Sequence, residues 1–258
     1  MMFAKILLKI LMVSAWLSLA FGTSQGNEIK QSQEQIQSQW NMIKRREVQN
    51  QDTMNSNVML HRATCSTILQ NNASSKSEMY HINPQGISSS WFQVYCNMTS
   101  NNGTTVIGHD SESTTLVKGC ENPGSYKRKI KYDIPLEQIF AIIKESSICE
   151  QYIKYECYHS RLLEKPFGWW VSRQGSQMNY WGGAAVNSGK CACAGMTDSC
   201  AGGKECNCDK NDGTWREDSG YLTDKNTLPV TELRFGDTGH PDVGEEGYHT
   251  LGKLRCWG

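Results

Sequence analysis

The segment KCACAGMTDSCAGGKECNCD, from Lys190 to Asp209, holds five cysteines in twenty residues. Two C-x-C doublets flank a single cysteine, Cys200. Such an array suits a metal cluster, a redox site or a set of disulfides. Zinc signatures usually place about two to four residues between paired cysteines. Exported thiols oxidise to disulfides, whereas cytosolic thiols stay reduced. The compartment in which the chain folds therefore decides which chemistry this segment has.

Residues 1–22 predict a secretory signal peptide. Lys5 and Lys9 precede an apolar run that extends from Ile10 to Phe21. Ala20 and Gly22 are small residues at a plausible cleavage site. This run is about a dozen residues long, whereas a helix needs about 20 apolar residues to span a bilayer. We expect a mature protein that is secreted, has no membrane span and lies in the extracellular matrix. In that oxidising space the clustered cysteines are expected to form disulfides and to hold no metal.

Three Asn-x-Ser/Thr sequons agree with export. They begin at Asn72, Asn97 and Asn102, and none has proline in the middle position. N-glycosylation of these asparagines would give residues 72–104 an exposed, sugar-bearing face.

The charge of the chain excludes some partner classes. Without residues 1–22 the chain has 24 basic and 26 acidic residues, a formal charge of −2, and we find no long run of either sign. Nucleic acid and anionic membranes are therefore not expected partners.

Residues 23–60 form a polar segment rich in Gln and Asn. Ile29, Ile36 and Ile43 recur at intervals of seven, which is typical of one helical stripe, but the pattern fails at Asn50. A short oligomerising helix and a flexible solvated stalk both fit, and the short pattern favours the stalk.

Residues 61–258 are expected to form one domain, because Cys65 and Cys256 bracket a region dense in Trp, Tyr and Gly. A helix is predicted after Pro135, with Leu136, Ile139, Phe140 and Ile143 at helical spacing. Alternating polarity or Gly-rich borders predict strands at residues 89–98, 151–158, 167–173, 178–183 and 228–237. The fold class is therefore α+β, with a mostly antiparallel sheet, short helices and many loops.

Two sets of motifs carry a family resemblance. The first is the opening of the domain, where a cysteine, an Ile-x-Pro and V-Y-C-x-M (Val94 to Met98) resemble the start of fibrinogen C-terminal domains. The second comprises CEQYIKYEC, FGWWVSR, YWGG, KCACAG and CNCDKNDGTWREDSG, which resemble the fibrinogen-like region of contactin-associated proteins, the neurexin-like adhesion molecules. The similarity covers roughly Cys65 to Cys256. The architecture is also loosely similar to secreted cnidarian proteins, some of them in the organic matrix of coral skeletons.

The resemblance implies a structural or adhesive module that contacts matrix or cell-surface proteins. A mineralised skeleton would be one setting, with a scaffold role, since the chain lacks the long Asp/Glu runs expected for mineral templating. The calcium loop and ligand pocket of fibrinogen-type lectins have no counterpart here, so neither calcium nor acetyl-sugar binding is implied. The only acidic loop candidate, residues 209–220, has Gly213 where an EF-hand needs Asp or Asn and Gly220 where it needs Glu, and we expect an ordinary solvated turn.

Resemblance and local spacing together pair Cys65 with Cys96, Cys149 with Cys157, and Cys200 with Cys206. Two further bridges are expected among Cys191, Cys193, Cys208 and Cys256.

Cys120 is the odd cysteine, in a sequence, VKGCENPGSY, typical of a turn. Its thiol is either free and buried or bonded to another chain, and we favour a covalent dimer or a link to a matrix protein.

The aromatic residues leave a second function class open, a sugar-binding lectin. Four tryptophans and a tyrosine could present rings to sugars: Trp169, Trp170, Tyr180, Trp181 and Trp215. Core packing is the favoured interpretation for this set.

No constellation of residues predicts an enzyme or a cofactor site. The six histidines are scattered and stand in no zinc-protease or nucleophile-elbow motif. His109, Asp110 and Ser111 are adjacent, but the members of a catalytic triad converge through the fold and not through adjacency.

Overall fold

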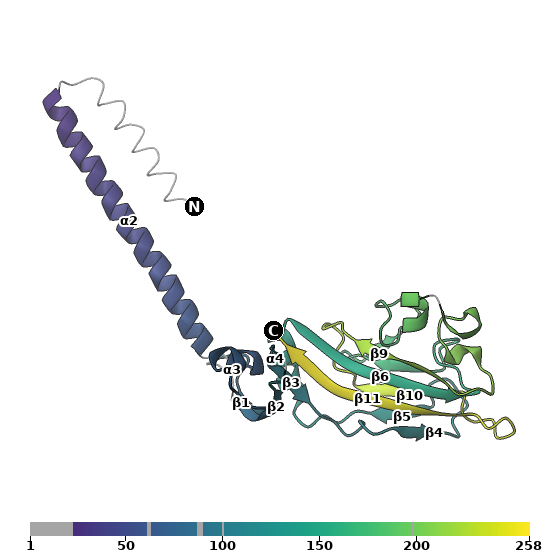
Figure 1. The fold of residues 1–258 in the computed structure, drawn as a ribbon. Coiled ribbons are helices and arrows are strands. Elements are labelled where there is room, and N and C mark those ends of the chain that lie inside the picture. The colour runs from purple at the N-terminus through teal and green to yellow at the C-terminus, as the bar shows by residue number, and fades with distance from the viewer. Residues whose placement is uncertain (1–22, 61–62, 87–89, 100, 198) are drawn as a thin grey trace. The chain divides into compact units, whose positions relative to one another are not determined.

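The computed structural model describes residues 23–60, 63–86, 90–99, 101–197 and 199–258. Contacts divide the chain into two units, residues 1–60 and 61–258 (Figure 1). The predicted signal peptide, residues 1–22, lies outside the described residues.

The described part of the first unit is one helix, α2 (Thr23–Leu60). The favoured expectation of a flexible stalk is therefore wrong. The segment has no proline and a single glycine, Gly26, and its many Gln, Glu, Lys and Arg side chains lose little freedom in a helix. Ile36, Trp40 and Ile43 are 46%, 39% and 53% exposed, so this apolar stripe is uncovered. Among the described residues, no helix is long and apolar enough to cross a bilayer.

Seven strands of the second unit form an antiparallel sheet in the order β1-β2-β3-β11-β6-β9, with β4 also paired to β11. Its strands are β1 (Glu78–Ile82), β2 (Phe92–Asn97), β3 (Thr104–Ile107), β4 (Thr115–Val117), β6 (Ile148–Tyr158), β9 (Arg216–Leu222) and β11 (Glu246–Trp257). The long strands β6 and β11 lie side by side along the domain (Figure 1). The expected antiparallel α+β architecture is confirmed.

A smaller antiparallel sheet has the order β5-β10-β7-β8. Its strands are β5 (Tyr126–Lys129), β7 (Trp169–Val171), β8 (Gln177–Met178) and β10 (Glu232–Phe235). The strand predicted at residues 178–183 is mostly wrong, because the chain turns after β8: the Trp181 amide donates to the Lys190 carbonyl and the Gly183 amide donates to the Tyr221 carbonyl.

The helices of this unit are short. They are α3 (Cys65–Asn71), α4 (Leu136–Glu145), η1 (Cys193–Thr197), η2 (Ala201–Gly203) and η3 (Cys208–Lys210). Helix α4 begins after Pro135, as predicted, and buries Ile139, Ile142 and Ile143.

Alternation along the strands builds the core. On β6, Ile153, Tyr155 and Cys157 are buried and the residues between them are half-exposed, as predicted. Tyr155 stacks on Phe235 of β10 with the ring centroids 4.4 Å apart. Tyr126 of β5 meets His249 of β11, Oη to Nε2, at 2.8 Å. The inner faces of the two sheets therefore pack against each other.

Five disulfides hold this domain. They are Cys65–Cys96, Cys149–Cys256, Cys157–Cys208, Cys191–Cys206 and Cys193–Cys200. The first matches the implied pairing, whereas the implied Cys149–Cys157 and Cys200–Cys206 pairings are wrong. The two bridges expected among Cys191, Cys193, Cys208 and Cys256 are wrong too, because each of these cysteines pairs outside that group. Cys149 and Cys157 stand eight residues apart on one strand, which separates them by about 26 Å. Strand β11 instead places Cys256 directly opposite Cys149, with 4.1 Å between the Cα atoms.

Two backbones touch where the turn at Gly182 meets β9. A Cβ added at Gly220 would lie 2.4 Å from the Gly182 carbonyl oxygen. We predict that Gly220→Ala lowers the free energy of unfolding by about 1–3 kcal/mol, because the backbone must shift. The control is Gly195→Ala, whose Cβ would meet only Ala184 at 3.7 Å. Urea denaturation measures both, and equal midpoints for the two variants would contradict the close approach.

Candidate functional site

The structure separates the five candidate sugar-stacking residues. Trp170, Tyr180 and Trp181 are buried. The indole of Trp170 donates to the Tyr180 carbonyl at 2.8 Å, and that of Trp181 donates to the Asp218 carbonyl at 2.9 Å. Trp169 is half-buried against Gly124, and Trp215 is 49% exposed. Only Trp215 offers a largely open ring.

Trp215 belongs to a cluster on the outer face of the seven-stranded sheet. Its ring lies 5.5 Å from that of Tyr158, at the end of β6, and 5.7 Å from that of Tyr248, near the start of β11. Strand register places Leu116 of β4 opposite Tyr248, and Leu116 is 45% exposed. We call these four residues the aromatic face.

The outer side of the same sheet continues beyond this cluster. Tyr152 and Tyr221 are register partners with rings 5.4 Å apart, and Tyr221 is 44% exposed. Between the two aromatic groups, Lys154 pairs with Glu156 at 2.9 Å. Exposed aromatic residues with locally neutralised charges are typical of a protein-binding surface. Alternation along residues 148–158 could have identified Tyr152 and Tyr158, but not their neighbours from other strands.

The sequons lie toward the opposite end of this sheet. Asn72 and Asn102 are exposed, and Asn97 is half-buried at the end of β2. Thr105, which follows them, pairs with Cys256 at the far end of β11 from Tyr248. Eight residues of strand correspond to about 26 Å, so these asparagines lie far from the aromatic face.

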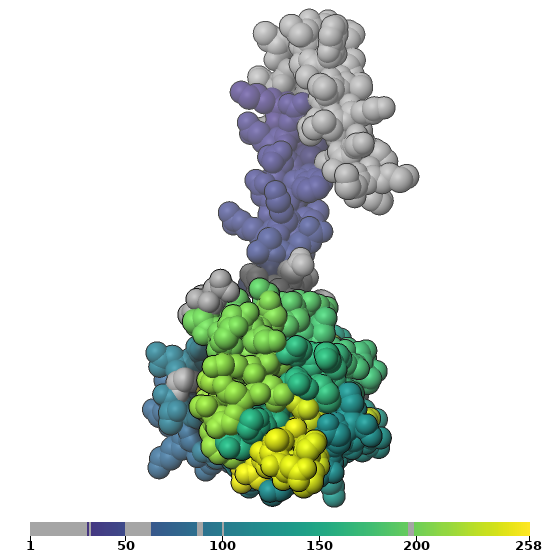
Figure 2. All heavy atoms as spheres, turned by 90° about the vertical axis from the view of Figure 1, so that its right-hand side faces the viewer, coloured from purple at the N-terminus to yellow at the C-terminus, as the bar shows by residue number. Residues whose placement is uncertain are grey.

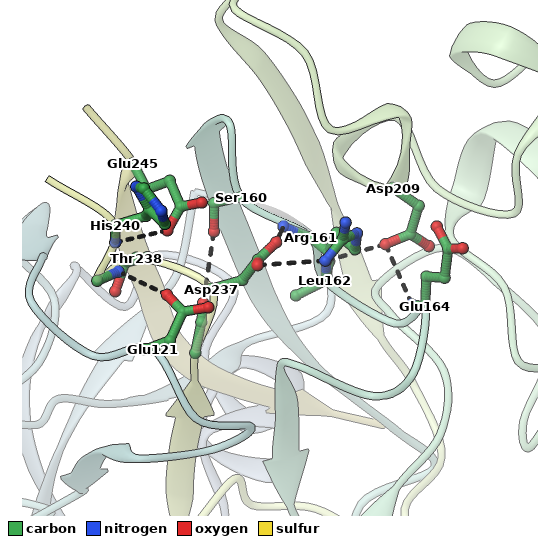
Figure 3. A network of polar contacts seen from close by, with 12 residues as sticks. Glu121, Ser160, Arg161, Leu162, Glu164, Asp209, Asp237, Thr238, His240 and Glu245 are labelled. Carbon is green, nitrogen blue, oxygen red and sulfur yellow. Dashed lines mark hydrogen bonds and ion pairs between the residues drawn. The ribbon is translucent and has the colours of Figure 1, made fainter. Parts of the chain in front are cut away.

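Two buried carboxylates fix the segment that follows β6 (Figure 3). Asp237 accepts from the Arg161 amide at 2.8 Å and from its guanidinium at 3.2 Å. Asp209 accepts from the amides of Leu162 and Glu164 at 2.9 and 3.1 Å. Burial raises the pKa of both carboxyl groups. Their main role is therefore to satisfy backbone donors.

Asp237 also forms an acidic trio with Glu121 and Glu245, whose ligand atoms lie within 4.8 Å of one another. The loop between β10 and β11 contributes to it and is the yellow segment turned to the viewer in Figure 2. Carboxylate oxygens are ligands for calcium. Here both Asp237 oxygens accept from Arg161, whose guanidinium supplies the neutralising charge.

Residues 209–220 are not the ordinary solvated turn that we expected. Asp209 and Asp218 are both 3% exposed. Asp218 accepts from the amides of Asn207 and Cys208 at 3.0 and 2.8 Å, whereas Asp212 pairs with Arg216 at 2.8 Å. Asp209, Asp212 and Asp218 therefore contact three different sets of partners.

The adjacent triad residue types form structural hydrogen bonds. His109 accepts from the Ser111 amide through Nδ1 at 3.1 Å, and its Nε2 lies 2.9 Å from the Gly252 carbonyl. Burial lowers the pKa of His109. The Ser111 hydroxyl accepts from Arg128 at 3.4 Å, and it is the backbone amide of Ser111 that contacts the imidazole.

Cys120 is the free cysteine of the domain and is half-buried. Its carbonyl accepts from the amide and hydroxyl of Thr238 at 3.0 and 3.1 Å, which fixes the loop. The predicted turn is present, with Ser125 donating to the Asn122 carbonyl.

The buried carboxyl group of Asp218 should make the free energy of unfolding depend on pH. Burial raises its pKa to about 6. The folded protein therefore retains a proton that the unfolded chain releases from about pH 4 upward. This stabilisation is complete below about pH 4 and is lost as the pH rises through 6. Relative to Asp218→Asn, the wild type should lose about 2 kcal/mol of unfolding free energy between pH 4.5 and 7.

Urea titrations across this pH range test the prediction. The control is Asp212→Asn, because its ion pairs with Arg216 and Lys210 lower the Asp212 pKa to about 2. The difference in unfolding free energy between Asp212→Asn and the wild type should stay nearly constant from pH 5 to 7. A constant difference for Asp218→Asn as well would contradict the prediction.

Comparison with known proteins finds relatives for part of this chain. No protein-family model matches it. Neurexin-4 of Drosophila melanogaster is 41% identical over 177 residues, which cover 65% of this chain and 14% of that protein. Contactin-associated protein 1 of mouse and of human is 38% identical over 173 residues, 65% of this chain and 12% of each relative. The chain therefore corresponds to a small part of each, and neurexin-4 and contactin-associated protein 1 are its homologues.

Proposed function

We propose that this chain is a secreted, extracellular adhesion module that binds a cell-surface or matrix protein through its aromatic face. The observation that carries this proposal is the uncovered cluster around Trp215, held on a sheet whose other side is the core. Tyrosine and tryptophan dominate binding energy at protein interfaces because they bury large rigid rings and keep a polar group at the rim.

The homologues support this class of function. The name of contactin-associated protein 1 states an association with contactin, and we propose a contactin as the first partner to test for this chain. Five disulfides are consistent with an extracellular location. We further propose a fibrinogen C-terminal-like fold, cleavage of residues 1–22 and N-glycosylation at Asn72, Asn97 and Asn102. The skeletal-matrix setting stays a prediction from resemblance.

Binding is proposed in preference to catalysis. Burial lowers the pKa of His109, and both of its ring nitrogens are engaged in hydrogen bonds. His249 is fully buried between the sheets, where burial lowers its pKa to about 4. Neither ring is placed to move a proton for a bound substrate.

Sugar binding is the second candidate function, and the exposed ring of Trp215 is the observation that favours it. A glycan array distinguishes the two classes. Micromolar binding of one glycan that disappears in Trp215→Ala, without binding to a contactin, would select the lectin.

We predict that Trp215→Ala raises the Kd for the partner at least about tenfold, because a central interface tryptophan is worth more than about 1.4 kcal/mol. Biolayer interferometry of the secreted chain against a contactin ectodomain measures this. The matched control is Trp91→Ala, since Trp91 is 55% exposed and lies outside the aromatic face. Equal loss in both variants, or unchanged affinity in Trp215→Ala, would reject the aromatic face as the binding surface.

We also propose that Cys120 forms an intermolecular disulfide, since ten of the eleven cysteines pair within the chain. On non-reducing gels the wild type should run as a dimer or larger complex and Cys120→Ser as a monomer. A monomeric wild type with one titratable thiol would disprove the bond.

A further inference from the structure

The outer face of the four-stranded sheet carries a row of lysines. The sequence YKRKIK, residues 126–131, has four basic residues in six and includes the edge strand β5. Tyr126 turns toward the core, where it contacts Phe235 and His249. Because neighbouring residues of a strand face opposite sides, Lys127 and Lys129 point away from the core, and both are exposed.

The register adds an aromatic ring to this row. Lys127 lies opposite Arg234 of β10, which in turn lies opposite Trp169 of β7. Strand geometry spaces Lys127 and Lys129 by about 6.7 Å and places Trp169 about 10 Å across the sheet from Lys127. The Trp169 ring is held against the backbone of Gly124, where an added Cβ would lie 2.1 Å from the ring.

The lysines on this face form no ion pair of their own within the described part of the chain, and Glu232, the register partner of Lys129, is engaged by Arg234. Arg128 pairs with Asp110 at 3.4 Å and Arg234 pairs with Glu232 at 2.9 Å. Lys127, Lys129 and the exposed Lys131 form no ion pair with any residue that the structure describes. Three positive charges therefore lie within five consecutive residues, 127–131, along the β5 edge of the sheet.

We propose that Lys127, Lys129, Lys131 and Trp169, here called the basic strip, bind a sulfated polysaccharide. Lysine ammonium groups bind sulfate oxygens as point charges and need no fixed fork geometry. A tryptophan beside them offers a surface for the apolar side of a pyranose ring. A polymer with both features fits the strip better than a small anion. Disulfides persist in the extracellular space, where sulfated polysaccharides also occur.

The basic strip and the aromatic face lie on opposite outer sides of the two packed sheets. The aromatic face belongs to β4, β6 and β11 and the residue before β9, whereas the strip belongs to β5, β7 and the second residue after β5. Loss of one binding activity therefore leaves the other measurable. The inference does not depend on the proposed protein partner.

The test uses the full secreted chain and a heparin oligosaccharide of defined length, measured by calorimetry and on a heparin column. The wild type should elute above the physiological ionic strength of about 0.15 M. Lys127→Ala/Lys129→Ala should weaken binding about tenfold and lower the salt slope of log K by about one to two, since two cationic contacts are lost. The matched control is Lys76→Ala/Lys144→Ala, which removes two other exposed lysines and should bind like the wild type.

Four outcomes would overturn the proposal. The first is wild-type elution below physiological ionic strength, and the second is equal binding by the two double variants. The third is loss of binding in Lys44→Ala/Arg45→Ala, which would move the site to α2. The fourth is tighter binding of a single-stranded oligonucleotide or of unsulfated hyaluronan than of heparin. Circular dichroism and urea midpoints confirm that each variant is folded.

Discussion

The pairing of β6 with β11 is the constraint on which the rest of the domain depends. The two strands run antiparallel from Glu246–Tyr158 to Trp257–Ile148. Cys149–Cys256 closes this pair at one end, and Cys157–Cys208 ties the other end of β6 to the cysteine-rich segment. Both strands alternate between core and surface, so fixing their register fixes the faces of every strand added to them.

The cysteine-rich segment depends on crosslinks more than on a core of its own. Between Lys190 and Asp209 the chain has many Ala and Gly residues, which bury little apolar surface. Cys191–Cys206 encloses Cys193–Cys200, so the inner loop is constrained inside the outer one. Asp218 of β9 supplies the remaining order by accepting from the backbone at Asn207 and Cys208. A carboxylate that is kept ionised in this position costs stability, as its raised pKa indicates.

Periodicity predicted the local structure, but contacts between distant segments could not be read from it. The faces of residues 92–96 and 151–157 and the helix after Pro135 followed from alternation and helical spacing. The disulfide partners did not, because Cys149 meets Cys256 only through strand pairing across 107 residues. The aromatic face could not be predicted for the same reason, because its residues come from four separate parts of the chain. Short spacing suggested Cys200–Cys206, but the fold nests the loops instead. In residues 23–60 the weak heptad was a poorer guide than the simple lack of helix-breaking residues.

One rule, alternation along strands, produces two outer surfaces of different chemistry. The seven-stranded sheet presents tyrosine, tryptophan and paired charges, whereas the four-stranded sheet presents unpaired lysines beside a half-buried tryptophan. Sites that share no residues and stand more than about 10 Å apart contribute nearly additively to free energy. A module with two such sites could hold a protein and a polysaccharide at once. Each ligand would then raise the effective concentration of the other when both belong to one surface or matrix. A rigid disulfide-bonded sandwich suits this task, because it fixes the two surfaces relative to each other and leaves mainly side chains to be ordered on binding.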